Sequence, residues 1–407
     1  MPQTDLPPAT APMRLATTIR PYDWGSVTAL PELFGTEPTG KPQAELWMGA
    51  HPGAPSTVHG TPLNEIIAAD PAATLGERTA ARFGAELPYL LKVLAIGRPL
   101  SLQVHPTTEQ AQAGYAEENA RGIPLDDYAR TYKDASHKPE MVCALTPFHG
   151  LCGFRPPAAT AGLLDRLDVP GLRPWIDTLR TGEPARALRA VFAEMLDEAA
   201  RPLRAQVEQA LLAATDHDAD HPDADHADAD DLAAYGDIAR AYPGDPGITA
   251  ALLLHHVSLR PGQALYLGAG VPHAYLGGIG VEIMANSDNV LRCGLTSKHV
   301  DVPELMRVVD FTPSDPHRVE PAQDASGAYN YRPPAPEFAL ARHDLDGAHL
   351  LPARVPQIVL CVEGEVRLGN DLTLRPGQSA FVPAAAPPAR LAGKGVVYRA
   401  QPGAFTM

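Results

Sequence analysis

Alternating apolar and polar residues mark the most informative stretch of the chain. Between residues 99 and 106, leucine and valine alternate with Ser101, Gln103 and His105. A period of two is typical of a β-strand, so these three polar side chains share one face of it. An amide and an imidazole two residues apart can converge on one metal ion, but an isolated pair is more often an ordinary polar strand face. A metal site is therefore predicted only if further ligands come from other segments.

The pattern around this stretch predicts a β-rich N-terminal region. Residues 14–60 form short segments broken by Gly and Pro, which indicates strands and turns, and residues 61–86 have the loose spacing of a helix or two. The apolar run 87–95 predicts a buried strand that contains Lys92. A lysine in such a run either extends to the surface or faces a polar cavity, and the polar strand that follows favours the cavity. A helix is expected after Glu109.

Helical spacing replaces this pattern between about 157 and 250. Apolar residues recur at i, i+3, i+4 and i+7 from Leu188 to Leu211, which predicts an inserted helical domain. Residues 216–231 alternate Asp with Ala and His, a composition that suggests metal binding. The run is of low complexity, repels itself and has no apolar anchors, so a disordered loop near 214–231 is predicted rather than a metal site.

An internal repeat appears once β character returns after residue 251. Residues 259–276 align without a gap onto 374–391, and half of the positions are identical. A Pro-Gly turn, a strand, a second turn and a strand opened by Pro-His are typical of a cupin jelly roll. The second copy has Pro388 where the first has His273. One copy therefore keeps a candidate ligand, and the other is expected to be a scaffold.

Length and pattern together predict the domain organisation. A chain of 407 residues is expected to form roughly two to three domains. The predicted fold class is mainly β with an α-helical insertion, built on tandem cupin or jelly-roll domains. We divide the chain into an N-terminal β region with the metal-ligand strand (1–155), a helical insertion (156–250), a catalytic cupin segment that completes the metal site (251–319) and a degenerate C-terminal cupin domain (320–407).

Composition excludes several function classes. The net charge is −15 and no basic stripe compensates for it, which argues against nucleic acid as a partner. We see neither a signal-peptide pattern at the N-terminus nor an apolar run of bilayer length, so a cytoplasmic protein without a membrane span is expected. Four separate cysteines without a C-x-x-C pair fit reduced thiols. Core packing is the expected role of Trp24 and Trp47.

Two further segments supply the missing ligands. Glu140 opens a predicted strand after Pro139, and His273 opens a strand of the first cupin copy. Together with Gln103 and His105 they make two imidazoles, a carboxylate and an amide, without a thiolate. This set suits Zn²⁺ with a position left for water or substrate, although Fe²⁺, Mn²⁺ or Co²⁺ could also bind.

At these residues the sequence resembles the type I mannose-6-phosphate isomerases. Residues 132–140 correspond to the family's Y-x-D-x-N-H-K-P-E, with Ser136 in place of Asn. Residues 273–298 correspond to its long H-A-Y…E-x-M-A-x-S-D-N-x-x-R-A-G-x-T-P-K, with Cys293 in place of Ala and Ser297 in place of Pro. With the polar strand and the helical insertion, the resemblance spans nearly the whole chain.

The resemblance implies a cofactor and a reaction. One Zn²⁺ per chain would be bound by Gln103, His105, Glu140 and His273, and mannose 6-phosphate would be converted reversibly to fructose 6-phosphate. The usual family role of this reaction is mannose activation towards GDP-mannose. Many relatives have an acidic or amide residue and then a basic one after the His-Pro pair, where this chain has two threonines beginning at Thr107. A phosphate contact from that basic residue is therefore in doubt.

Isomerisation through a cis-enediol needs an acid or base and a group that stabilises negative charge on the sugar oxygens. The candidate catalytic residues, whose order stays open, are His137, Lys138, Glu282, Asp288 and Arg292. The candidate substrate-binding residues are Lys92, Ser101, Tyr275 and Lys298. Arg292 could polarise a sugar oxygen or hold the phosphate with Lys298. The alternative for Arg292 and Asp288 is a structural ion pair at i, i+4.

Two other functions remain open from the sequence. An iron-dependent cupin dioxygenase could use His105, Glu140 and His273 as a facial triad, but Gln103 and the nearby basic residues favour a phosphorylated sugar. A non-catalytic sugar-binding cupin is expected to have lost its ligands or its acid and base residues, and here all are present. The expected partner is a small sugar phosphate, and the expected assembly is a monomer or a homodimer.

Overall fold

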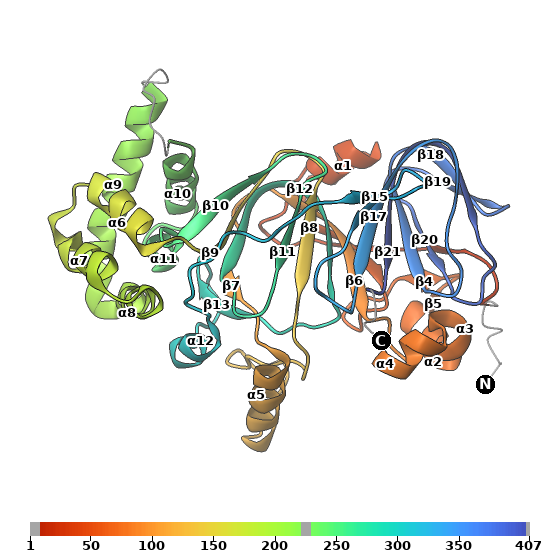
Figure 1. The fold of residues 1–407 in the computed structure, drawn as a ribbon, viewed down its shortest axis with the longest axis horizontal. Coiled ribbons are helices and arrows are strands. Elements are labelled where there is room, and N and C mark those ends of the chain that lie inside the picture. The colour runs from red at the N-terminus through yellow and green to blue at the C-terminus, as the bar shows by residue number, and fades with distance from the viewer. Residues whose placement is uncertain (1–8, 221–228, 404–407) are drawn as a thin grey trace.

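Two antiparallel β-sheets form the body of the molecule in the computed structural model, which describes residues 9–220 and 229–403 (Figure 1). The strands of the larger, 11-stranded sheet are β2 (Thr18–Arg20), β3 (Glu45–Gly49), β6 (Tyr89–Ile96), β7 (Leu102–Val104), β8 (Glu140–Ala144), β9 (Phe148–Phe154), β10 (Leu254–Leu259), β11 (Ala264–Leu267), β12 (His273–Ala285), β13 (Leu291–Gly294) and β14 (Arg318–Val319). The strands of the 8-stranded sheet are β1 (Met13–Leu15), β15 (Ala322–Gln323), β16 (Tyr329–Tyr331), β17 (Ala339–Leu350), β18 (Gln357–Leu368), β19 (Leu372–Leu374), β20 (Ser379–Val382) and β21 (Arg390–Gln401). β4 (Thr57–Val58) and β5 (Thr61–Pro62) pair separately.

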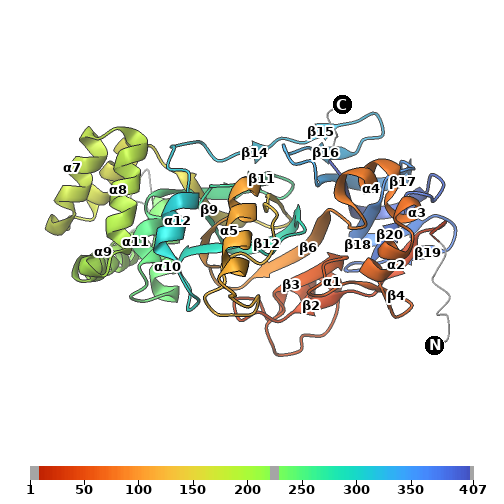
Figure 2. The same cartoon turned by 90° about the horizontal axis from the view of Figure 1, so that it is seen from below.

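Helices surround the sheets and form a separate group at one end of the molecule (Figures 1 and 2). Those of the main body are α1 (Ala29–Phe34), α2 (Leu63–Ala69), α3 (Pro71–Leu75), α4 (Glu77–Phe83), α5 (Thr108–Ala120) and α12 (Val302–Val308). The separate group consists of α6 (Pro157–Arg166), α7 (Arg173–Thr181), α8 (Pro184–Leu196), α9 (Arg201–Asp220), α10 (Ala229–Ala241) and α11 (Gly247–Ala251). The helical spacing read from the sequence therefore corresponds to a helical insertion. None of the helices in the described ranges is long and apolar enough to cross a membrane.

The predicted loop at 214–231 is wrong at both of its ends. Helix α9 continues to Asp220 and α10 begins at Ala229. The Thr215 hydroxyl donates to the carbonyl oxygen of Leu211 within α9, and Arg240 of α10 pairs with Asp216 of α9 at 2.7 Å. Contacts with a neighbouring helix thus stabilise residues that lack apolar anchors of their own. Residues 221–228 lie outside the described part of the chain.

Strand β12 connects the two halves of the larger sheet. Its first residues pair with β7 and β9, and its residues from Gly278 onward pair with β6 and β8. The register shifts between Tyr275 and Gly277, which marks a β-bulge. Gly278 follows with a φ of 109°, and a Cβ there would lie 2.5 Å from the carbonyl oxygen of Pro147. Glycine is therefore required where the strand changes partners.

The repeat seen in the sequence is confirmed in the strands. β11 and β20 occupy equivalent positions of the two copies, and each is followed by a long strand, β12 or β21. One hydrophobic core joins the two sheets, with Met141 and Ile283 from the larger and Ile358 and Phe381 from the smaller.

Strand pairing also crosses the predicted domain boundaries. β1 lies at the start of the chain but pairs with β20 in the C-terminal sheet. The strands of 251–319 join those of the N-terminal region in one sheet, which brings the ligands of both segments together.

Candidate metal centre

Four residues from β7, β8, β12 and the segment directly after β7 converge on one place in the fold. Gln103 lies in β7 and His105 just after it, while Glu140 and His273 are the first residues of β8 and β12. His273 lies directly opposite Gln103 in the sheet. One ligand atom from each of His105, Glu140 and His273 lies within 4.8 Å of the others, and all three residues are buried. The ligand set predicted from the sequence is thus brought together by the fold.

Backbone carbonyl groups orient both imidazoles. Nδ1 of His105 donates to the carbonyl oxygen of Asn289 at 2.8 Å, and Nδ1 of His273 donates to that of Val271 at 2.9 Å. The proton is therefore on Nδ1 of each neutral ring, and the lone pair of each Nε2 faces Glu140. The Nε2 atoms of His105 and His273 lie 3.4 and 3.6 Å from the two carboxylate oxygens.

The unpartnered atoms of this cluster fit a cation. Nε2 of His105 and Oε2 of Glu140 are buried without a hydrogen-bond partner. Ligands about 2.0–2.1 Å from a tetrahedral zinc ion lie about 3.3 Å apart, close to the separations seen here. Nε2 of Gln103 lies 3.3 Å from Nε2 of His273, and a rotation of the amide group places its oxygen there instead.

Electrostatics keep the ligands in the protonation states that a metal needs. Burial lowers the pKa of His105 to about 4, so this imidazole is neutral near pH 7. Burial raises the pKa of Glu140, but opposing influences, of which the charge of Lys138 is the largest, hold that pKa well below its usual range. The ammonium group of Lys138 lies 3.2 Å from Oε1 of the carboxylate. Neutral imidazoles and an ionised carboxylate are the forms that ligate a metal.

A cavity of about 670 Å³ opens beside the cluster. The predicted residues that line it are Lys92, Ser101, Gln103, Lys138, Glu140, Tyr275, Glu282, Asp288, Arg292 and Lys298. His105 and His273 are fully buried next to them. The volume suits a small phosphorylated molecule.

A buried lysine and two carboxylates form one wall of the cavity. Nζ of Lys92 lies 3.1 Å from Oε2 of Glu282 and 3.4 Å from Oε2 of Glu45. Burial disfavours the charged lysine, but the two carboxylates outweigh burial and raise its pKa above the ordinary value. Burial raises the pKa of Glu282 although Lys92 opposes this. With one ammonium between two carboxylates, Glu282 is suited to hold a proton.

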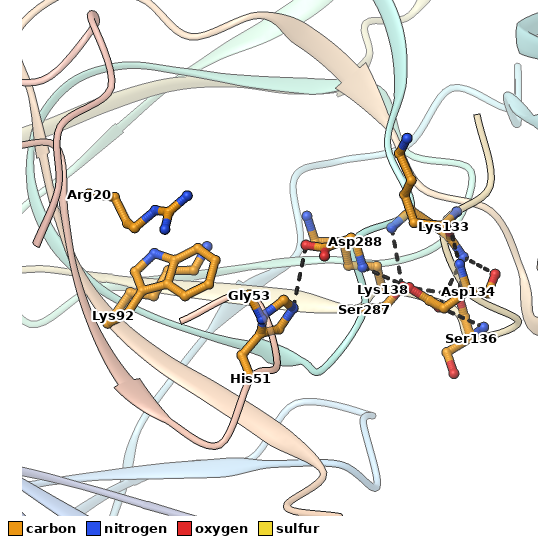
Figure 3. Close-up of polar contacts among 12 residues, drawn as sticks. Arg20, His51, Gly53, Lys92, Lys133, Asp134, Ser136, Lys138, Ser287 and Asp288 are labelled. Atoms are coloured by element: carbon orange, nitrogen blue, oxygen red, sulfur yellow. Dashed lines mark hydrogen bonds and ion pairs between the residues drawn. The ribbon is translucent and has the colours of Figure 1, made fainter. Parts of the chain in front are cut away.

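Arg292 and Lys298 make another part of the cavity lining basic. Burial lowers the pKa of Arg292, and burial together with Arg292 lowers that of Lys298. No ion pair in residues 9–220 and 229–403 joins Arg292 to Asp288, so the predicted alternative of a structural pair is wrong. Asp288 instead lies 3.4 Å from Nε2 of His51 (Figure 3). Arg292 lies opposite Gln103 in the sheet, which keeps its positive charge close to the metal ligands.

Comparisons with known proteins agree with this geometry. Residues 13–157 match the family model of the phosphomannose isomerase type I catalytic domain, and residues 331–402 match that of the mannose-6-phosphate isomerase cupin domain. The mannose-6-phosphate isomerase of Escherichia coli (strain K12) is 40% identical over 397 residues, which cover 95% of this chain and 98% of the relative. The Homo sapiens enzyme of the same name is 31% identical over 395 residues, with 89% and 90% covered.

The chain belongs to the type I phosphomannose isomerase family.

Solved structures of this family share the whole fold. A mannose 6-phosphate isomerase solved with zinc and yttrium is 38% identical and has a TM-score of 0.86, with 97% of this chain and 100% of that chain covered. A zinc-bound holo structure is 37% identical with a TM-score of 0.87 and the same coverage. The predicted fold class, family and enzyme class, a mannose-6-phosphate isomerase, are thereby confirmed.

The structure of this phosphomannose isomerase family member separates one predicted catalytic residue from the others. His137 does not line the cavity, and its Nε2 lies 2.9 Å from Oε1 of Glu337. Its neighbour Lys138 does line the cavity. Neighbouring residues in extended backbone point in opposite directions, so only one of the two can face the sugar.

Sequence reasoning missed several contributors to the cavity. Trp47, expected in the core, lines it together with Glu45, and the two share a face of β3 because they are two residues apart. That spacing could have revealed both. Asn289 was also missed: its carbonyl oxygen orients His105, and its side chain bonds to the backbone of Asp134 and to that of Ser136.

The loop that carries Asp288 is held by a network around Asp134 (Figure 3). The Ser287 hydroxyl donates to Oδ1 of Asp134 at 2.9 Å, and the backbone N–H of Asp288 donates to Oδ2 at 2.9 Å. The family motif at 132–140 and the second motif at 273–298 therefore bond to each other. These bonds hold residues that are far apart in the sequence in the lining of one cavity.

Proposed function

We propose that the chain interconverts mannose 6-phosphate and fructose 6-phosphate through a cis-enediol in the 670 Å³ cavity, with one zinc ion bound per chain. The observation that carries this proposal is the arrangement of the cavity. Metal ligands, a buried Lys92–Glu282 pair and the basic groups of Arg292 and Lys298 all line the same space or adjoin it. This combination matches an anionic sugar that must lose and regain a proton.

The metal would be held by Gln103, His105, Glu140 and His273. The unpartnered Nε2 of His105 and Oε2 of Glu140 support this assignment, as do the backbone carbonyl groups that orient both imidazoles. The relatives solved with zinc support the choice of metal. A bound zinc ion supplies Lewis acidity to an oxygen of the substrate.

We assign recognition of the phosphate to the basic part of the cavity lining. Arg292 and Lys298 bear positive charges that no carboxylate pairs with in the described part of the chain, so they are available to a dianion. A planar guanidinium binds two phosphate oxygens at once. Ser101 lines the same cavity and can donate a further hydrogen bond.

Proton transfer is assigned to groups next to the metal ligands. A base takes the C2 proton, the C2–H electrons form the C1–C2 double bond, and the π electrons of the C1 carbonyl move to O1, which takes up a proton to give the enediol. Loss of the proton from O2 then forms the C2 carbonyl while C1 takes up a proton, which gives the ketose. Glu282, whose pKa burial raises, and Lys138 are the groups best placed to carry this proton, with Asp288 as a further ionised carboxylate in the cavity lining. Tyr275 is buried with its hydroxyl unpartnered, so it is free to bond a sugar hydroxyl. The cytoplasmic location and the monomer or homodimer expected from the sequence remain predictions.

The test measures both the fate of a deuterium label at C2 and the dependence of the activity on metal. Purified protein is given mannose 6-phosphate labelled with deuterium at C2, before and after chelation and with zinc added back. His273→Ala is compared with His149→Ala, an exposed histidine outside the cavity. We expect fructose 6-phosphate with deuterium lost to solvent, activity removed by chelation and by His273→Ala, and none of these losses in His149→Ala. Complete retention of deuterium at C1 would exclude an enediol, and no turnover by zinc-loaded protein would overturn the proposed reaction.

A further inference from the structure

A buried histidine outside the predicted site contacts the carboxylate of Asp288. His51 follows β3, the strand that carries Glu45 and Trp47, and only 3% of its surface is exposed. The ring of Trp47 packs edge-on against it, with ring centres 5.1 Å apart and planes at 80°. Figure 3 shows the imidazole pointing from this strand towards Asp288. Packing therefore fixes the ring plane of His51.

The backbone decides which nitrogen of His51 carries the proton. The N–H of Gly53 donates to Nδ1 at 3.1 Å, so Nδ1 has a lone pair and the neutral ring has its hydrogen on Nε2. A Cβ at position 53 would lie 3.1 Å from Nδ1 and 3.3 Å from Cε1. Glycine is the residue that lets the backbone approach the ring this closely.

The protonated Nε2 faces the cavity carboxylate. It lies 3.4 Å from Oδ1 of Asp288, whose side chain is 56% exposed and lines the cavity. The contact with His51 is the largest of the influences that lower the pKa of Asp288, and the charges of Lys138 and Lys92 act in the same direction. Asp134 meets only the backbone N–H of Asp288. Among the described residues found to influence this carboxylate, His51 is thus the one whose imidazole N–H faces it.

We propose that His51 is a positioning residue that keeps Asp288 ionised and turned into the cavity. Gly53 and Trp47 hold the ring so that Nε2–H, rather than a lone pair, meets the carboxylate. The contact can shorten when a substrate excludes water from the cavity, as hydrogen bonds of empty sites commonly do. This inference rests on the proposed function, because it takes Asp288 to act on the sugar.

Two substitutions of His51 separate positioning from packing. In His51→Gln the amide N–H₂ can replace the ring donor, whereas His51→Leu fills the space without a donor. We expect His51→Leu to lower kcat about tenfold while KM changes much less, because His51 does not touch the substrate, and His51→Gln to restore most of kcat. The deficit of His51→Leu should grow as the pH falls below about 5, because Asp288 without this donor takes up its proton at a higher pH. Zinc content and the unfolding midpoint, measured alongside, show whether each variant is folded.

Asp288→Asn and the double variant complete the test. If His51 acts through Asp288, His51→Leu costs little activity once Asp288→Asn is present. Equal losses in His51→Leu and His51→Gln, or full additivity with Asp288→Asn, would overturn the positioning role. Full activity of Asp288→Asn would instead remove Asp288 from the proposed function. An impaired Asp288→Asn with an unimpaired His51→Leu would refute only the inference about His51.

Discussion

Replacing Lys92 by methionine tests the charge balance of the cavity wall. Lys92, Glu282 and Glu45 are almost completely buried, with 9, 5 and 10% of their side chains exposed. Methionine fills a similar volume but leaves two buried carboxylates without their shared cation. We expect both a loss of stability and a loss of activity, because this ammonium is the cation shared by the two carboxylates and opposes the rise that burial causes in the pKa of Glu282.

The size of the stability loss follows from the two distances. Unit charges 3.1 and 3.4 Å apart attract by about 5 kcal/mol each at an effective dielectric constant of about 20. The cost of burying Lys92 offsets much of this attraction, so the expected net loss is about 3–5 kcal/mol, the range found when one partner of a buried ion pair is removed. A folded domain is stable by only about 5–15 kcal/mol, so this loss is readily measured.

Urea unfolding measures the loss against two controls. Lys41→Met removes an exposed lysine and is expected to leave the midpoint almost unchanged. Adding Glu282→Gln to Lys92→Met removes one of the two stranded carboxylates and is expected to recover part of the stability without restoring turnover. A loss below about 1 kcal/mol in Lys92→Met, similar to that in Lys41→Met, would refute the view that the lysine holds the two carboxylates together.

Three further predictions concern the phosphate, the bend in β12 and the helical insertion. Arg292→Met should raise KM for mannose 6-phosphate about tenfold or more and leave binding of unphosphorylated mannose unchanged, as steady-state kinetics and calorimetry would show; an unchanged KM would remove this residue from phosphate binding. Gly278→Ala should lower the unfolding free energy by about 2 kcal/mol or more, because its Cβ would lie 2.5 Å from the carbonyl oxygen of Pro147; normal stability in chemical denaturation would show that the bend relaxes. Asp231 contacts His256 at 3.1 Å and has a lowered pKa, so its stabilisation should be present above about pH 4 and lost as the pH falls through the folded-state pKa. Asp231→Asn should therefore lower stability by about 1 kcal/mol at neutral pH and much less in acid, and an equal loss at both pH values would contradict this.

The sequence by itself determined which faces and which chemistry are present. The alternation at 99–106 predicted that Gln103 and His105 share a face, and the repeat singled out His273 as a candidate ligand because its counterpart is Pro388. These features are local, because a strand's period of two and a turn's residue types depend on neighbours a few positions away. For the same reason Lys92, a single charge in an apolar strand, could be assigned to the cavity.

Only the tertiary structure decided which segments meet. Four features join residues that are between 184 and 368 positions apart: the contact of His137 with Glu337, that of Asp288 with His51, the orientation of His105 by Asn289, and the pairing of β1 with the C-terminal sheet. Periodicity states which way a side chain points within its own strand, but not what lies opposite, since strand partners are chosen by packing over the whole chain. The ligands were therefore readable from the sequence, and the groups that orient them were not.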